Sequence, residues 1–289
     1  MPASPPPLHD HHCHGANSRT RDLFRQRRPI MKPTRKRPQG RTSRSASSVA
    51  EEPVRLNKAI ADAGIASRRH ADDLIAAGRV RINGEVVTEL GIKVSTNDVV
   101  SVDGEQISRR KHLTYVLLNK PKDVISTSSD ERGRTTVFDI VRIHDRLFTV
   151  GRLDRNTTGV LLITNDGDLA HRLMHPRHEV PRSYKVKLDR DILPAHARKI
   201  SGGIDLDDGP TQPCEVLIDP KDKSVVHMVI REGRNREVRR IFEAMGYEVR
   251  GLDRKQYAFL TARGLKRGEY RHLSSDEVHE LRTMVGLEA

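Results

Sequence analysis

Hydrophobic positions near the start of the folded part of the chain recur first at helical and then at strand spacing. Apolar residues in 56–63 and in 71–75 repeat every three or four positions, and each stretch is followed by a glycine that suits a helix end. Ser67 is a favourable N-cap for the second helix. Alternating apolar residues at 80–82 then precede Asn83-Gly84, a pair typical of a type I′ hairpin turn. The pattern predicts a small α-α-β unit that ends near residue 105.

The rest of the chain alternates between strand-like and helical stretches. Apolar or alternating runs predict strands at 115–118, 160–163, 182–188 and 225–230. In the third of these, Tyr184 points the same way as core residues, so a core tyrosine is its simplest interpretation. Helical spacing at 238–245 predicts an amphipathic helix that Gly246 ends, and Ser274-Ser275-Asp276-Glu277 is a capping box that starts a last helix.

One acidic residue, Asp154, has a setting that suits chemistry. Gly151 and Gly159 frame a polar loop that carries this carboxylate between two arginines, and the loop leads into the strand at 160–163. Asn165-Asp166-Gly167 is expected to end that strand as a tight turn. A strand can fix such a residue while the loop exposes it. A turn aspartate that binds its own backbone is the alternative, and the local sequence leaves both open.

Charge is distributed unevenly along the 289 residues. The net charge is +13, and residues 1 to 50 hold eleven Lys/Arg against two Asp, so +9 of it lies there and only +4 in the other 239 residues. A basic chain favours a polyanionic partner, either nucleic acid or an anionic membrane surface. Two cysteines provide no disulfide framework, and no run of about 18 apolar residues exists. We therefore expect a cytoplasmic protein with no membrane span.

Residues 1 to about 52 are rich in Pro, Ser and Arg and are expected to form a disordered basic tail. Histidines surround Cys13 in this tail, but no second ligand group follows at a recognised spacing, and Met31 could be the true start. His171 and His175 are spaced like metal ligands on a helix, yet no third ligand is evident. We predict no metal site.

Basic residues cluster at two places in the folded part. In the small unit they fall at helix starts and at a strand entry, where free N–H groups could help to hold phosphates; these are Arg55, Lys58, Arg68, Arg69, Arg79 and Arg81. Solvated surface cations are the alternative there. Between 231 and 240, five arginines, among them Arg234 and Arg236, mark a strand-to-helix junction that favours an anion. Both clusters fit a phosphate-rich partner.

Ordered motifs give the chain a recognisable resemblance. Arg55 to Gly104 resembles an S4 RNA-binding domain, and Tyr115 to Leu281 resembles the catalytic domain of the bacterial ribosomal pseudouridine synthases related to the small-subunit enzyme RsuA. The segment 151–167 looks like that family's signature. Supporting matches are Leu-Asn-Lys-Pro (118–121), Gly-Arg-Thr-Thr-Val (133–137), Arg-Ser-Tyr-Lys-Val (182–186), Glu-Gly-Arg-Asn-Arg-Glu-Val-Arg-Arg (232–240) and Leu-Lys-Arg-Gly-Glu-Tyr-Arg-His-Leu (265–273). The segment 232–240 looks most like the family's large-subunit branch.

The resemblance implies an α+β fold in two domains. A small α-α-β S4 domain (53–107) would be joined by a linker (108–113) to a catalytic domain (114–289) built on a mostly antiparallel mixed sheet, with the basic tail (1–52) in front. It also implies the reaction. A uridine in ribosomal RNA would lose its N1–ribose bond, the uracil would turn, and C5 would be joined to the sugar.

Residue roles follow from the same resemblance. Asp154 matches the essential aspartate, which could add to the base or act at the sugar. Tyr184 matches the stacking tyrosine, Arg239 the active-site basic residue that pairs with the aspartate, and Arg152 a contact to RNA around the flipped nucleotide. No metal or redox cofactor is required. The S4 unit and the tail would bind phosphates of rRNA or of an assembly intermediate, and the family suggests a monomer.

Other interpretations remain open at this stage. A non-catalytic S4-type RNA-binding or ribosome-assembly protein would predict a decayed site, whereas Asp154, Tyr184 and Arg239 are all present in their motifs. A small-subunit rRNA enzyme would share the fold. A DNA-binding regulator would need a helix-turn-helix pair after Arg236, where one helix after a strand is expected instead.

Overall fold

The computed structural model describes residues 52–108, 112–128 and 130–287. Nearly all of the predicted tail, with Cys13, its neighbouring histidines and Met31, lies outside these residues, as does half of the predicted linker. Among the described helices, none combines the length and the apolar character that a membrane crossing requires.

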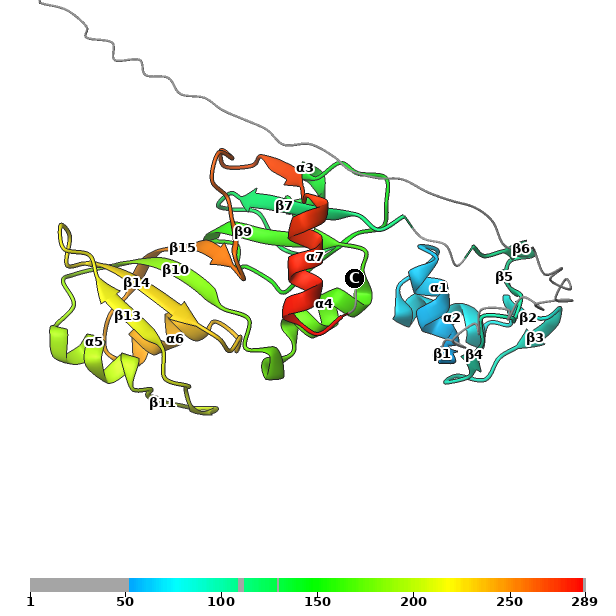
Figure 1. The fold of residues 1–289 in the computed structure, drawn as a ribbon, viewed down its shortest axis with the longest axis horizontal. Coiled ribbons are helices and arrows are strands. Elements are labelled where there is room, and N and C mark those ends of the chain that lie inside the picture. Colours follow the sequence, from blue (N-terminus) through cyan, green and yellow to red (C-terminus); the bar gives the residue numbers. More distant parts are fainter. Residues whose placement is uncertain (1–51, 109–111, 129, 288–289) are drawn as a thin grey trace, which may run out of the picture. The chain divides into compact units, whose positions relative to one another are not determined.

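The first elements form the small unit that the spacing predicts (Figure 1). Two helices precede a four-stranded sheet with the order β3-β2-β5-β6, and a short β1–β4 pair lies beside them. The elements are β1 (Val54–Arg55), α1 (Leu56–Asp62), α2 (Arg68–Ala76), β2 (Val80–Ile82), β3 (Glu85–Val87), β4 (Lys93–Val94), β5 (Val100–Val102) and β6 (Glu105–Gln106). Apolar residues of both helices and of β2, β4 and β5 make one buried cluster.

Local signals in this unit are confirmed. The Ser67 hydroxyl accepts a hydrogen bond from His70 N at 3.0 Å and so caps α2. Asn83 and Gly84 both have positive φ, 52° and 90°, as a type I′ turn between β2 and β3 requires. Asparagine and glycine adopt this conformation at the smallest cost, so two residues suffice to set the hairpin.

A nine-stranded mixed sheet dominates the rest of the chain, with the order β13-β14-β10-β15-β9-β7-β17 and with β16 and β8 paired to β15 and β9. Only β9 and β15 pair in parallel among the described strands, so the predicted mostly antiparallel mixed sheet is confirmed. The strands are β7 (Tyr115–Lys120), β8 (Phe148–Thr149), β9 (Thr157–Thr164), β10 (Arg182–Leu188), β13 (Glu215–Ile218), β14 (Val225–Ile230), β15 (Val249–Tyr257), β16 (Leu260–Thr261) and β17 (Tyr270–His272). A separate hairpin pairs β11 (Asp205–Leu206) with β12 (Gly209–Pro210).

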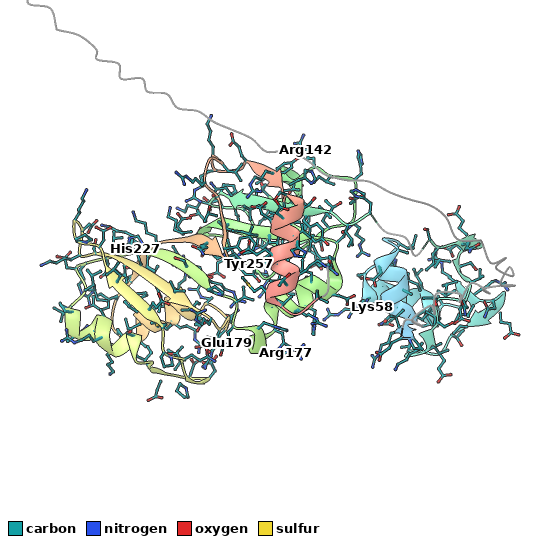
Figure 2. The ribbon with its side chains drawn as sticks, in the orientation of Figure 1. Lys58, Arg142, Arg177, Glu179, His227 and Tyr257 are labelled. Atoms are coloured by element: carbon teal, nitrogen blue, oxygen red, sulfur yellow. The ribbon has the colours of Figure 1, made fainter. Side chains whose placement is uncertain are left out.

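Helices and apolar side chains fill both faces of this sheet. Along β9, Leu161 and Ile163 belong to one core, whereas Val160 and Leu162 belong to the other. The first core also takes in residues of α3 (Val137–Ile140), α5 (Pro194–Ser201) and α6 (Glu237–Ala244), and the second those of α4 (Gly167–Met174) and α7 (Ser275–Met284). Side chains that point alternately to the two faces along β9 therefore account for the helices on both sides of the sheet. Figure 2 shows the side chains, among them Tyr257 of the second core.

The parallel β9–β15 pair depends on one glycine. Gly159 has φ +108°, and a Cβ at this position would lie 2.1 Å from the carbonyl oxygen of Arg254. Only glycine permits such an approach between two backbones. Because Asp154 lies five residues before Gly159, this contact sets where the loop of Asp154 meets β15.

The prediction that Asn165-Asp166-Gly167 forms a tight turn at the end of β9 is wrong. The segment does not close a tight turn; it passes directly into α4, with Asp166 as the N-cap whose carboxylate accepts Leu169 N at 3.0 Å. The other oxygen of Asp166 binds the Tyr115 hydroxyl at 2.8 Å and Arg282 at 3.0 Å. A helix cap and a turn use the same residue types, so spacing alone does not separate them.

Candidate active site

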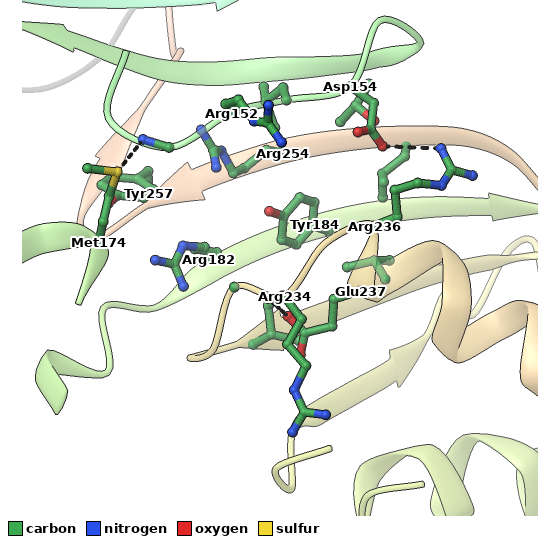
Figure 3. A pocket seen from close by; sticks show the side chains of 17 residues that line it. Arg152, Asp154, Met174, Arg182, Tyr184, Arg234, Arg236, Glu237, Arg254 and Tyr257 are labelled. Atoms are coloured by element: carbon green, nitrogen blue, oxygen red, sulfur yellow. Dashed lines mark hydrogen bonds and ion pairs between the residues drawn. The ribbon is translucent and has the colours of Figure 1, made fainter. Parts of the chain in front are cut away.

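A pocket of about 200 Å³ opens beside the parallel pair (Figure 3). Its walls come from the 151–157 loop, from β10 and β15, and from the segment 230–238 that joins β14 to α6. Met174, at the end of α4, completes the lining. Segments far apart in sequence thus meet at one cavity, and it contains Asp154.

Two arginines hold the Asp154 carboxylate. Its Oδ2 lies 3.6 Å from Arg236 Nη1 and 3.7 Å from Arg239 Nε, and the side chain is 39% exposed. Arg239 is only 11% exposed and donates from Nη1 to the Val249 carbonyl at 3.0 Å. Burial and the charge of Arg236 lower the pKa of Arg239, while Asp154 raises it. The Asp154 carboxylate is therefore accessible from the pocket, and the largely buried Arg239 orients it.

Arg236 reaches Asp154 through an unusual backbone conformation. It is the residue before α6 and has φ 46° and ψ 29°, in the left-handed region that non-glycine residues occupy at a cost of roughly 1 to 3 kcal/mol. Arg239 follows three residues later and so lies on the same side of the helix. Backbone strain at a non-glycine residue that contacts a pocket carboxylate is typical of a functional site.

A buried lysine holds the loop of Asp154 from below. The side chain of Lys120 is fully buried at the end of β7. Its Nζ donates to the carbonyl oxygens of Pro121 and Asp154 at 3.1 Å, of Arg155 at 3.3 Å and of Thr157 at 2.9 Å. Burial lowers the pKa of this lysine to about 8, while the charges of Asp154 and Asp123 raise it. One ammonium group thus ties three loop carbonyls to a central strand.

Tyr184 contributes a flat apolar surface. Its ring is on β10, opposite Arg254 of β15, and only 7% of the residue is exposed. It lines the pocket, and Figure 3 shows it between Asp154 and Arg182. The predicted strand and inward direction are confirmed, and the packing fixes the ring before any ligand arrives.

The basic residues predicted to bind RNA differ in how free they are. Arg234 is committed within the protein, with Nε 2.8 Å from Glu232 and Nη1 3.3 Å from Asp208. Arg79 binds Asp103 at 2.6 Å, and Lys58 binds Asp62 at 2.8 Å. No ion pair within the described ranges involves Arg55, Arg68, Arg69 or Arg152, all of which are exposed. The structure brings Arg152, Arg234 and Arg236 to the pocket of Asp154.

Several pocket residues were not singled out by the sequence. Three buried side-chain atoms in the described part of the chain have no hydrogen-bond partner: Thr157 Oγ1, Glu237 Oε1 and Arg254 Nη2. All three residues line this pocket. A weak signal existed for Arg254, a charged residue two positions after Leu252 on an alternating strand, hence on its core-facing side.

Glu237 lines the pocket, and a second carboxyl group, that of Glu232, lies beside it. Glu237 is 3% exposed, and its Oε2 accepts Arg234 N at 3.1 Å. Glu232 lies within hydrogen-bonding reach of it and accepts Gln212 N at 2.7 Å and Arg234 Nε at 2.8 Å. Burial and then Glu232 raise the pKa of Glu237 to about 7, whereas hydrogen bonds keep that of Glu232 below its usual range despite partial burial. At neutral pH one proton can therefore be shared here.

The pocket suits a ligand that has a planar group and, close to that group, a negative charge. A carboxylate held by two guanidinium groups, an ordered aromatic ring and further arginines lie around one cavity. No group of three or more His, Cys, Asp or Glu in the described part could hold a metal ion. His171 and His175 are exposed, with ring centres 5.8 Å apart.

Comparison with family models assigns both folded parts. Residues 54–100 match the S4 domain, and residues 114–244 match the RNA pseudouridylate synthase model.

Relatives extend this match over most of the chain. It is 46% identical over 236 residues to ribosomal large subunit pseudouridine synthase B of Bacillus subtilis, which covers 80% of this chain and 96% of that protein. It is 39% identical to the Pseudomonas aeruginosa protein of the same name, over 81% of this chain and 63% of that one. A crystal structure of a pseudouridylate synthase superposes with a TM-score of 0.57 at 31% identity, covering 79% of this chain and 99% of that one.

Proposed function

The chain belongs to the RNA pseudouridylate synthase family, and from this premise we propose that it converts a specific uridine of large-subunit ribosomal RNA to pseudouridine with Asp154 as the essential residue. The observation that carries the residue assignment is the position of Asp154 in the pocket, held by Arg236 and Arg239 at 3.6 and 3.7 Å. Both relatives described above are named for the large subunit, which supports that target.

The reaction conserves atoms, so the site needs to supply only positions, charges and one reactive group. The bond from N1 to C1′ breaks, the uracil turns within the pocket, and a bond from C5 to C1′ forms. C5 gives up a proton and N1 ends with one. Asp154 acts on this nucleotide either by attack or by deprotonation, both of which a carboxylate can perform. Arg239 and Arg236 keep the carboxylate in place through these steps.

Tyr184 provides the surface against which the uracil lies. A base in structured RNA has to be flipped out, at a cost of a few kcal/mol, and stacking on an aromatic ring returns roughly 1 to 3 kcal/mol. Because the ring is already ordered by its packing on β10, stacking costs little further side-chain entropy. Stacking alone does not offset the flip, so contacts to the RNA backbone have to contribute as well.

Further affinity comes from outside the pocket. We assign RNA binding to an S4 domain at 53–107, with Arg55, Arg68 and Arg69 as phosphate contacts, and to the basic tail at 1–52. Residues 108–113 act as a linker, and 114–289 form the catalytic domain. Phosphate contacts of this kind add affinity without choosing a sequence, which leaves RNA shape to select the uridine. The protein acts as a monomer on rRNA or on an assembly intermediate.

A pseudouridine map of rRNA tests this proposal. Cells that lack the gene are complemented with the intact protein, with Asp154→Asn, or with Asp191→Asn as a matched change at an exposed aspartate outside the pocket. We expect one large-subunit site to vanish in the deletion and to return with the intact protein and with Asp191→Asn only. Restoration by Asp154→Asn would remove Asp154 from the chemistry. An unchanged map would favour a non-catalytic RNA-binding protein, and loss of a small-subunit site would correct the target.

A further inference from the structure

Three arginines of the pocket differ from the rest in having no carboxylate partner. Arg234 and Arg236 line the pocket and each pairs with Asp or Glu, as does Arg239 beside them. Arg152, Arg182 and Arg254 line the same pocket, and no ion pair in the described part of the chain includes any of them. Three positive charges of the pocket therefore have no carboxylate of the described residues within ion-pair distance.

Arg254 is the most constrained of the three. It is 2% exposed, and its Nε donates to the Val160 carbonyl at 2.7 Å. Its Nη2 is one of the three buried atoms without a partner. A buried charge is costly unless it is paired and fully hydrogen-bonded. A carbonyl group satisfies one N–H of this guanidinium but does not neutralise it, so the site is incomplete in the free protein.

Arg182 meets Arg254 across a shared aromatic ring. Their Cζ atoms lie 5.6 and 5.0 Å from the ring centre of Tyr257, whose hydroxyl donates to the Leu173 carbonyl at 3.1 Å. Arg182 Nη1 donates to the Glu232 carbonyl at 2.8 Å. A Cβ on residue 233 would lie 3.3 Å from the same nitrogen, so Gly233 leaves room for this guanidinium. Carbonyls, a ring and a glycine thus position two cations without removing their charge.

We propose that Arg152, Arg182 and Arg254 form a subsite for a phosphodiester group next to the flipped uridine. This deepens the proposed function and rests on it. A phosphate carries the negative charge that the cluster lacks, and its oxygens match the planar donors of guanidinium groups. Uracil is neutral and does not compensate these charges. In Figure 3 Arg182, Arg254 and Tyr257 lie toward one end of the view and Asp154 toward the other, and Arg152 lies between Arg254 and Asp154.

The arrangement assigns separate tasks to the two ends of the pocket. A phosphate held at Arg182 and Arg254 would fix the sugar end of the nucleotide while the base lies on Tyr184. The sugar and base could then rearrange at Asp154 without the nucleotide leaving the site. Correct placement of reacting groups is among the largest contributions that a protein makes to a rate.

Binding of small nucleotides to the full-length protein tests the subsite without requiring catalysis. The probes are uridine, uridine 5′-phosphate and uridine 3′-phosphate, titrated by NMR or calorimetry. We expect one of the phosphates to bind about tenfold more tightly than uridine, a difference that Arg254→Met and Arg182→Met remove. Arg263→Met, which changes an exposed arginine outside this pocket, should retain it.

Several outcomes would overturn the subsite. Equal binding of the three probes, failure of all three to bind at millimolar concentration, or a phosphate preference that survives in Arg182→Met and Arg254→Met would each do so. If those variants do not fold, Arg152→Met takes their place, because Arg152 is exposed on a loop and should lower the preference several-fold. A phosphate preference in a protein that forms no pseudouridine would refute the proposed function and leave the subsite standing.

Discussion

Replacing Glu237 by glutamine should make the protein less sensitive to alkaline pH. Glu237 is buried beside Glu232, one of its oxygens accepts no hydrogen bond, and its pKa is raised from 4.5 to about 7 by burial and then by Glu232. Arg234 N donates to the other oxygen of Glu237. The Cys214 thiol lies nearby, and burial together with the charges of Glu237, Glu232 and Glu215 raises its pKa to about 11. A glutamine retains an acceptor for Arg234 N and gains an N–H for Glu232.

The sign follows from proton binding. Below about pH 4.5 Glu237 is neutral in both the folded and the unfolded chain, so its raised pKa has no effect. Between that pH and about 7 the folded chain keeps the proton and the unfolded chain has lost it, so the free energy of unfolding falls as the pH rises. Above about 7 the full penalty is present. A shift from 4.5 to about 7 corresponds to about 3 kcal/mol.

Denaturant unfolding followed by circular dichroism at about pH 5 and about pH 8.5 measures this. Glu237→Gln should match the wild type at the lower pH and exceed its free energy of unfolding by up to about 3 kcal/mol at the higher pH. Glu248→Gln, the same change at an exposed side chain, should follow the wild type at both. If the wild type and Glu237→Gln lose stability in parallel as the pH rises, the reasoning about a shared proton is refuted.

Three further substitutions test the support of the site. Lys120→Met leaves four carbonyl acceptors without their ammonium donor, so we expect the free energy of unfolding to fall by at least about 3 kcal/mol and the single-turnover rate to decrease. Denaturant titration and rapid quench measure these two quantities. An unchanged rate would show that the loop of Asp154 keeps its conformation without Lys120. Gly159→Ala places a Cβ 2.1 Å from the Arg254 carbonyl oxygen and should lower the free energy of unfolding by several kcal/mol. Gly133→Ala, at a positive φ with nothing within 4 Å, should lower it by about 1 kcal/mol. Comparable midpoints of unfolding for the two variants would contradict the close approach at Gly159. Arg239→Met should reduce the single-turnover rate at least about 100-fold and change RNA affinity only a few-fold, because the Arg239 guanidinium orients the Asp154 carboxylate. An affinity loss as large as the rate loss would instead make Arg239 an RNA contact.

Local chemistry made several elements predictable. Ser67 before α2 and the Ser274–Glu277 capping box at α7 act within one helical turn, so the residues that decide them are adjacent in sequence. Asn83-Gly84 likewise sets its hairpin alone. The mostly antiparallel mixed sheet was expected from the family resemblance, and the pairing of β9 with β15 could not be seen in either strand.

The site depended on contacts that span the chain. Asp154 was recognisable because its glycine-framed loop and its motif are local. Arg254 and Lys120 were not, since the sequence of each strand does not show what its charged side chain faces. Only the register with β10 and β9 brings the first to the pocket and the second beneath the loop. At 165–167, turn and helix cap share their residue types, and the pairing of Asp166 with Arg282 of α7 lies far outside the local window.

The buried polar side-chain atoms that lack a partner in the described part of the chain gather at one pocket, and one residue with strained backbone also lines it. Arg236 holds a left-handed conformation, and the three unpartnered buried atoms belong to residues that line the pocket of Asp154. Each such feature costs folding free energy, and the rest of the described core is paired and apolar. A protein can hold such groups only where its packing is strong enough to prevent relaxation, which the two apolar layers around β9 provide. Donors fixed in this way need no reorganisation when charge arrives, and that is the condition under which electrostatic contacts favour a transition state most.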